Sequence, residues 1–139
     1  MHEVTPLDAA LRRIGDRWTL LIVASLLEGP RRFGELQRSV PGIATNVLSA
    51  RLRQLERQGL AVSRPYSERP VRLEYELTTG AAELAGALRL LAAWGAEAGD
   101  GGEGVVGVPV HPVCGTRLEV RYWCPTCQQV ADGEEEFWV

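Results

Sequence analysis

Two short segments near the C-terminus share a pattern of residue types that can bind a metal ion. Each consists of a donor residue, a proline, a variable residue and a cysteine, as in His111-Pro112-Val113-Cys114 and Cys124-Pro125-Thr126-Cys127. A gap of two residues between donors lets a tight turn direct both of them to one metal ion. One imidazole and three thiolates fill a closed tetrahedral site, which is typical of structural and not catalytic zinc. The sequence therefore predicts one structural zinc ion per chain, bound by His111, Cys114, Cys124 and Cys127.

Two alternatives for the three cysteines stay open. They could be free, partly buried thiols in a tail without metal, since an odd number of cysteines cannot all pair within one chain. They could also bind a metal without His111, with an acid or a water molecule as the fourth ligand. Iron could occupy the same ligands, but zinc is commoner in structural sites of mixed nitrogen and sulfur.

A second group of residues, in the middle of the chain, has the chemistry to bind duplex DNA. On a helical wheel over residues 44–58, Leu48, Leu52 and Leu55 form a narrow apolar stripe, and polar residues occupy the opposite face. An α-helix fits the major groove, where asparagine can pair with adenine and arginine with guanine. The residues predicted to contact DNA are Arg32, Thr45, Asn46, Ser49, Arg53, Arg57, Arg64, Arg69 and Arg72.

The charge distribution agrees with this prediction, although the net charge of −3 hides it. All 15 basic residues are arginine, and residues 31–72 hold nine of them against three acids, a local charge of +6. Residues 99–139 hold two arginines against seven acids, a local charge of −5. A basic middle favours a polyanionic partner, and arginine can contact phosphate and guanine bidentately. The alternatives are a genome that favours arginine codons and an ordinary solvated helix surface.

The periodicity of apolar residues predicts the elements that carry these groups. We expect helices over 6–14, 18–27 with Asp16 as N-cap, 33–39 and 44–58, where Thr45 replaces Ala44 as the cap. Strands over 61–66 and 71–77 form a basic hairpin, and one long helix follows from Thr78 or Thr79 to about residue 98. A strand with alternating Leu118, Val120 and Tyr122 should return the second cysteine segment to the first.

This order predicts a mainly α fold with a small β-hairpin wing (α+β), a winged helix-turn-helix, followed by a small β unit. We expect three parts: 1–98, a Gly-rich linker over 99–106, and a C-terminal unit over 107–139 that resembles a zinc ribbon. That unit is too short to fold by apolar burial alone.

The chain has no Gly-rich phosphate loop after a strand and no serine nucleophile motif, so we expect no enzyme activity. No apolar run approaches the ~18 residues of a membrane span and no secretory signal is evident, which predicts a cytoplasmic, nucleoid-associated protein without membrane contact.

Five ordered motifs over residues 6–98 resemble the HxlR-type winged-helix transcriptional regulators, which are MarR-like. They are GDRWTLLI at 15–22, RFGEL at 32–36, PGI at 41–43 with the segment that follows to residue 60, the wing strand over 70–78, and AWG at 93–95. The resemblance implies a homodimer that binds pseudo-palindromic operators and usually represses nearby genes. It also implies structural roles for Trp18 and Arg51. A small-molecule effector of unknown identity is a further partner to expect.

The outer helices, 6–14 and 80–97, should form the dimer in such a regulator. The apolar residues predicted at that interface are Leu7, Leu11, Leu84, Leu88, Leu91 and Trp94. The chain departs from the family at Thr5, where many members carry a cysteine before the proline that opens the first helix. Thiol-based sensing at that position is therefore not expected. The alternative function is a protein-interaction adaptor that uses the wing and the zinc-ribbon-like unit without reading bases.

Overall fold

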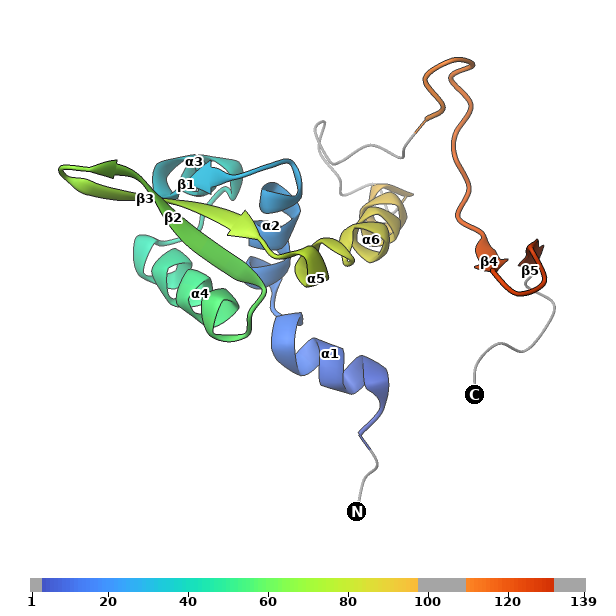
Figure 1. Cartoon of the computed structure of the whole chain (residues 1–139), viewed down its shortest axis with the longest axis horizontal. Coiled ribbons are helices and arrows are strands. Elements are labelled where there is room, and N and C mark those ends of the chain that lie inside the picture. Colours follow the sequence, from blue (N-terminus) through green and yellow to red (C-terminus); the bar gives the residue numbers. More distant parts are fainter. Residues whose placement is uncertain (1–3, 98–109, 132–139) are drawn as a thin grey trace. The chain divides into compact units, whose positions relative to one another are not determined.

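The computed structural model describes residues 4–97 and 110–131 (Figure 1). The predicted linker over 99–106 and the acidic stretch over 132–136 lie outside the described residues. The chain divides into two compact units, residues 1–91 and 92–139, which are described separately.

The elements alternate between helices and short strands. The helices are α1 (Pro6–Ile14), α2 (Arg17–Leu27), α3 (Phe33–Ser39), α4 (Thr45–Arg57), α5 (Thr79–Ala82) and α6 (Ala85–Glu97). The strands are β1 (Arg31–Arg32), β2 (Ala61–Glu68), β3 (Val71–Leu77), β4 (Tyr122–Cys124) and β5 (Gln129–Ala131). The predicted bounds of α3 and of the strand over 71–77 agree with the structure, and those of α4 differ from it by one residue at each end.

The core of the first unit lies where α2, α3 and α4 meet the base of the β2–β3 hairpin. Its buried residues are Ile22, Val23, Leu26, Leu36, Val40, Ile43, Leu48, Leu52, Leu55 and Ala61. The members from α4 are the three leucines of the predicted apolar stripe. Burial of this stripe fixes which face of α4 points away from the protein.

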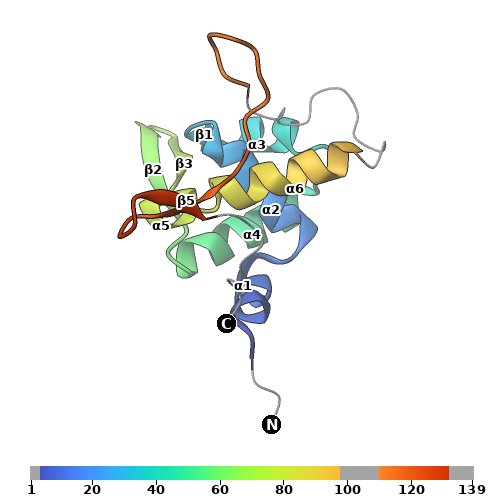
Figure 2. The same cartoon turned by 90° about the vertical axis from the view of Figure 1, so that its right-hand side faces the viewer.

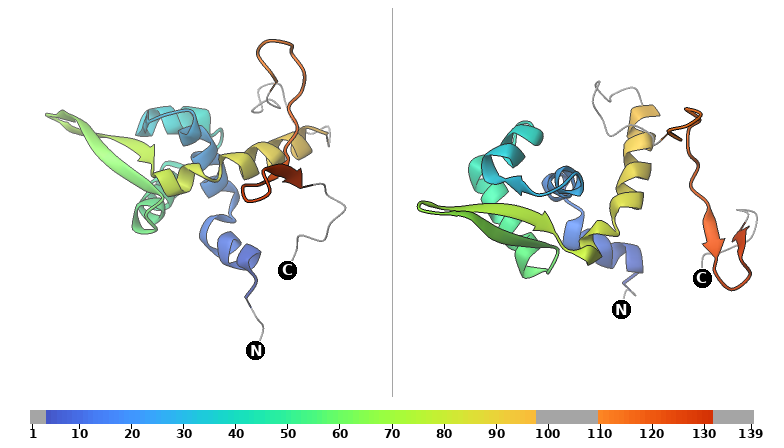
Figure 3. Two further views of the ribbon diagram at one scale, coloured as in Figure 1. Left: turned by 45° about the vertical axis from the view of Figure 1, so that its right-hand side comes forward. Right: turned by 45° about the horizontal axis from the view of Figure 1, so that its top comes forward.

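A three-stranded antiparallel sheet has the order β1-β3-β2. The β2–β3 hairpin extends well beyond the helices of the unit, as the wing of the predicted fold should (Figures 1 and 3). Strand β1 was not expected from the sequence; in it, Arg31 pairs with Tyr75 and Arg32 pairs with Glu74. This short strand joins the start of α3 to the wing.

The prediction of a single long helix after the wing is wrong, because the chain forms two helices there, α5 and α6. Thr78 caps α5, as predicted, and its hydroxyl accepts a hydrogen bond from the N–H of Ala81 (3.4 Å). The N–H of Leu84 then bonds to Ala81 O (3.1 Å), three residues back, before regular α-helical bonding resumes in α6. Ala81 is fully buried, which anchors α5 on the protein before the chain turns into α6.

The strand predicted over residues 118–122 does not form over residues 118–121, because the observed strand begins at Tyr122 and ends at Cys124. β4 pairs with β5, which follows it directly, and an isolated bridge joins Val110 to Arg117. Each segment that contains donor residues therefore closes a small hairpin of its own, and the short hairpin expected between the two segments does not form.

Among the described residues, no helix is both long and apolar enough to cross a membrane.

Candidate nucleic-acid interface

Helix α4 presents a polar face on the side opposite its buried leucines. Asn46, Arg53 and Arg57 are exposed on this face, and Ser49 is half-buried. The Nε–H of Arg53 donates to Ser49 O (3.3 Å), so the first part of the arginine side chain lies along the helix surface. An amide and two guanidiniums on one exposed helical face are suited to the donor and acceptor pattern of the major groove.

The side chain of Asp16 joins the start of α2 to α4. It caps α2 by accepting from the N–H of Thr19 (3.1 Å), it is hydrogen-bonded to the Thr19 hydroxyl, and it accepts from Nε–H of Arg51 (3.1 Å). Burial acts to raise the pKa of Asp16, but the hydrogen bonds from Thr19 and the positive charge of Arg51 outweigh it and hold the pKa below its ordinary value. The structural role predicted for Arg51 is thereby explained: this arginine holds α4 on the protein and does not belong to the exposed face.

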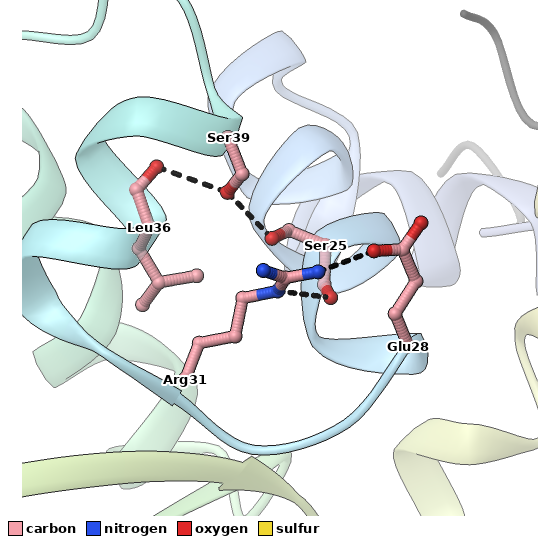
Figure 4. A network of polar contacts seen from close by, with 5 residues as sticks. All are labelled: Ser25, Glu28, Arg31, Leu36 and Ser39. Carbon is pink, nitrogen blue, oxygen red and sulfur yellow. Dashed lines mark hydrogen bonds and ion pairs between the residues drawn. The ribbon is translucent and has the colours of Figure 1, made fainter.

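A network of polar contacts positions α3 against the end of α2 (Figure 4). The hydroxyls of Ser25 and Ser39 are hydrogen-bonded (2.6 Å), and Ser39 also donates to Leu36 O (3.2 Å). Arg31 donates to Ser25 O (3.2 Å) and forms an ion pair with Glu28. These contacts hold the two helices that precede α4 in one arrangement.

The contact that Thr45 makes at the start of α4 differs from the predicted N-cap. Ala44 is the N-cap and offers no side-chain bond, whereas Thr45 lies inside the first turn. The hydroxyl of Thr45 accepts from Nε2–H of Gln37 (2.7 Å) on α3. The prediction that Thr45 caps the helix is therefore wrong, since its hydroxyl instead connects α3 to α4.

The arginines of the wing are exposed along the hairpin. Arg64 lies 3.6 Å from Glu76 on the neighbouring strand, and both side chains are largely open to solvent. Arg69 and Arg72 are exposed and have no ion pair within the described part of the chain. Uncompensated guanidiniums at the surface favour contact with phosphate groups.

Arg32 connects the wing to α3, an arrangement that the sequence did not predict. Its guanidinium lies 4.1 Å from the ring centroid of Tyr66 on β2, and 3.8 Å from Glu35 on α3. Arg32 and Arg72 line one shallow hollow together with Tyr66 and Tyr75. The pairing of β1 with β3 places Arg32 there, and it joins residues more than forty positions apart, for which local sequence patterns give no signal.

The predicted dimer residues fall into two groups. Leu84 and Leu88 are half-buried and pack against the core of their own chain. Leu7, Leu11, Leu91 and Trp94 are exposed, with 67% of Leu7 and 72% of Trp94 accessible to solvent. Helix α1 has no buried residue and stands apart from the other helices of its unit (Figure 2). Two helices of the chain thus expose large apolar side chains.

The predicted metal ligands lie in two separate pairs. Cys114 Sγ is 3.4 Å from His111 Nδ1, and the N–H of Cys127 donates to Cys124 Sγ (3.5 Å). Within residues 4–97 and 110–131, no three His, Cys, Asp or Glu side chains lie close enough together to hold a metal ion. Hydrogen bonds with the side chain and backbone of Thr116 lower the pKa of the Cys114 thiol, and those with Cys127 lower the pKa of Cys124.

Comparison with known proteins agrees with this arrangement of helices and wing. The HxlR-like helix-turn-helix family matches residues 13–102. The chain is 42% identical over 118 residues to the HTH-type transcriptional regulator Rv3095 of Mycobacterium tuberculosis, which covers 85% of this chain and 74% of the relative. Because 118 of 139 residues are aligned, the likeness extends beyond the family domain and includes the segment with His111 and Cys114.

Two solved structures show the same fold. The HTH-type transcriptional regulator YtcD has a TM-score of 0.64 at 35% identity, covering 70% of this chain and 99% of the other. A MarR-family transcriptional regulator from Porphyromonas gingivalis W83 has a TM-score of 0.65 at 32% identity, covering 70% and 95%. The winged helix predicted from the sequence is confirmed, and the chain belongs to the HxlR-like helix-turn-helix family of transcriptional regulators.

Proposed function

We propose that the protein is a homodimeric, sequence-specific DNA-binding regulator that represses transcription from a pseudo-palindromic operator. The observation that carries this proposal is the exposed face of α4, where Asn46, Ser49 and Arg53 lie opposite three fully buried leucines. These residues are the base-reading groups. Arg57 and the arginines around the wing contact the phosphate backbone and set the position of α4 in the groove.

The homodimer is supported by apolar side chains that the single chain leaves uncovered. Leu7 and Leu11 on α1, and Leu91 and Trp94 on α6, are exposed. A second copy that covers both helices removes this apolar surface from water. Two-fold symmetry then presents two copies of α4 to two half-sites of one operator.

Selection of binding sites from a random duplex library, followed by titration at several salt concentrations, tests the proposal. We expect one palindromic site to be enriched and its affinity to fall steeply with salt, because bound phosphates release counterions. Arg53→Ala should weaken binding to the selected site by about 1–3 kcal/mol while relaxing the preference at one base position.

Arg121→Ala is the matched control, since it removes the same charge outside the family domain, from an exposed residue paired with Glu119. It should leave affinity and preference unchanged. Equal affinity for all duplexes with a flat salt dependence would contradict the proposal. That result would favour the alternative function, an adaptor that docks protein through the wing and the C-terminal unit.

A further inference from the structure

The C-terminal unit contains the same small hairpin twice, at an offset of 13 residues. Val110 bridges to Arg117 around the first turn, and Trp123 pairs with Val130 around the second. Both hairpins are antiparallel and close over six intervening residues. Such a repeat is absent from the remainder of the described chain, where the hairpin of the wing is much longer.

The backbone of the two turns agrees in detail. The N–H of Gly115 donates to His111 O, and the N–H of Gln128 donates to Cys124 O, both at 2.8 Å. Gly115 and Gln128 both have a positive φ, 70° and 53°. Gln128 is the only residue other than glycine with a positive φ in the described structure, and glutamine rarely adopts this conformation. The second turn therefore keeps the shape of the first even without glycine.

The first turn brings its two donor atoms to the separation that one metal ion requires. Zinc binds sulfur at about 2.3 Å and nitrogen at about 2.0–2.1 Å, so tetrahedral sulfur and nitrogen ligands lie roughly 3.5 Å apart. His111 Nδ1 and Cys114 Sγ are 3.4 Å apart. In the second turn, the backbone N–H of Cys127 donates to Cys124 Sγ (3.5 Å), so this sulfur faces the backbone of the second cysteine.

Apolar burial does not hold these hairpins together. Among residues 110–131, none is fully buried, and Val113, Val120, Tyr122 and Trp123 are all exposed. A unit of this size without a core needs a metal ion or a disulfide to hold one structure. Nine residues separate Cys114 from Cys124, and an extended chain of that length spans up to about 30 Å, so both turns can reach the same ion.

We propose that His111, Cys114, Cys124 and Cys127 bind one zinc ion per chain, which joins the two hairpins into one zinc-ribbon-like unit. The ion is structural, because four protein ligands leave no position for water or substrate. Its binding provides the free energy that orders residues 110–131. The site lies outside the residues of the HxlR-like domain, so it is an addition to the DNA-binding fold.

Metal analysis of the purified full-length chain tests the proposal directly. We expect one zinc per chain, and three thiols that react with a thiol reagent only after a chelator removes the metal. A metal-free chain whose three thiols react at once would overturn the proposal in favour of free cysteines. Half a zinc per chain would also overturn it, because the ion would then be shared between two chains.

Two ligand variants and a control separate the four-ligand site from a three-cysteine site. Cys124→Ser should abolish zinc binding. His111→Ala should weaken zinc binding by at least the roughly 10–100-fold that loss of an outer-shell partner costs. His2→Ala, which removes the only other histidine, should have no effect. Unchanged zinc affinity in His111→Ala would overturn the role of the imidazole.

An NMR measurement with and without chelator shows where the metal acts. Removal of zinc should collapse the amide resonances of residues 110–131 towards unstructured positions while those of residues 13–91 stay in place. Resonances of 110–131 that do not move would contradict a structural role. DNA binding is measured separately, so failure of the zinc proposal and failure of the proposed function give different results.

Discussion

Replacement of Asp16 should reveal how α4 is held on the protein. Two variants distinguish its roles, because asparagine caps a helix about as well as aspartate but carries no charge. Asp16→Asn removes the charge next to Arg51 and keeps the cap. Asp16→Ala removes the cap, the partner of Arg51 and the partner of the Thr19 hydroxyl together.

The structure gives the sizes of these losses. The exposed fractions of the Arg51 and Asp16 side chains are 32% and 39%, so solvent screens the ion pair and limits its contribution to about 0.2–1 kcal/mol. Loss of an N-cap costs ~1 kcal/mol. Thr19 is only 1% exposed, and an unpaired buried hydroxyl costs about 1–3 kcal/mol. We therefore expect Asp16→Asn to lower the free energy of unfolding by about 0.5 kcal/mol and Asp16→Ala by ~3 kcal/mol.

Urea denaturation at a fixed protein concentration measures both losses, since the stability of a dimer depends on concentration. The pKa of Asp16 is lowered in the folded protein from its ordinary 3.8, so its contribution is present above that pH. It is lost as the pH falls through the folded-state pKa. Asp16→Asn should therefore lose least stability at the lowest pH at which the protein still folds.

A double-mutant cycle with Arg51→Gln isolates the ion pair, with an expected coupling of about 0.2–1 kcal/mol. Arg12→Gln is the matched control, because it breaks an exposed ion pair, with Asp8 at 2.9 Å, whose two partners both lie in α1. It should cost less than about 0.5 kcal/mol. Equal losses for Asp16→Asn and Asp16→Ala would contradict these roles of Asp16, because the charge would then outweigh the cap and the buried hydroxyl.

Three further predictions follow from the same structure. Gly59→Ala should destabilise the protein by about 1 kcal/mol because φ is +68° there, whereas Gly80→Ala in α5 should be neutral or stabilise it by about 0.5 kcal/mol. Urea denaturation of both variants distinguishes backbone strain at Gly59 from the effect of the added methyl group alone. Trp94→Glu should convert the dimer to a monomer in analytical ultracentrifugation, whereas Val71→Glu, at an equally exposed residue, should leave it a dimer. If the Trp94→Glu variant is still a dimer, the interface lies elsewhere. Arg69→Ala should reduce the slope of log affinity against log salt by about 0.9, equally for operator and unrelated duplexes, and a loss confined to the operator would assign it a base instead of a phosphate.

The sequence alone was sufficient for helices α1 to α4 and for the exposed face of α4. The leucines at 48, 52 and 55 recur at the helical period, and this local regularity determines both the helix and its buried side. Asp16 and Gly59 lie at helix boundaries for equally local reasons, a side chain that caps and a residue that tolerates positive φ. The structural role of Arg51 came from resemblance to a family, and the contact with Asp16 explains it.

Contacts between distant residues were decided only in the tertiary structure. The pairing of β1 with β3, the stacking of Arg32 on Tyr66 and the bond between Gln37 and Thr45 each join separate elements. A periodic pattern reports which face of an element is buried but not which partner covers it. The same limit applies to the break between α5 and α6, which lies next to the fully buried Ala81 and leaves no mark in the apolar spacing. Local patterns thus determined helices α1 to α4 and the two strands of the wing, whereas long-range packing decided how they are joined and where β1 and the break after α5 lie.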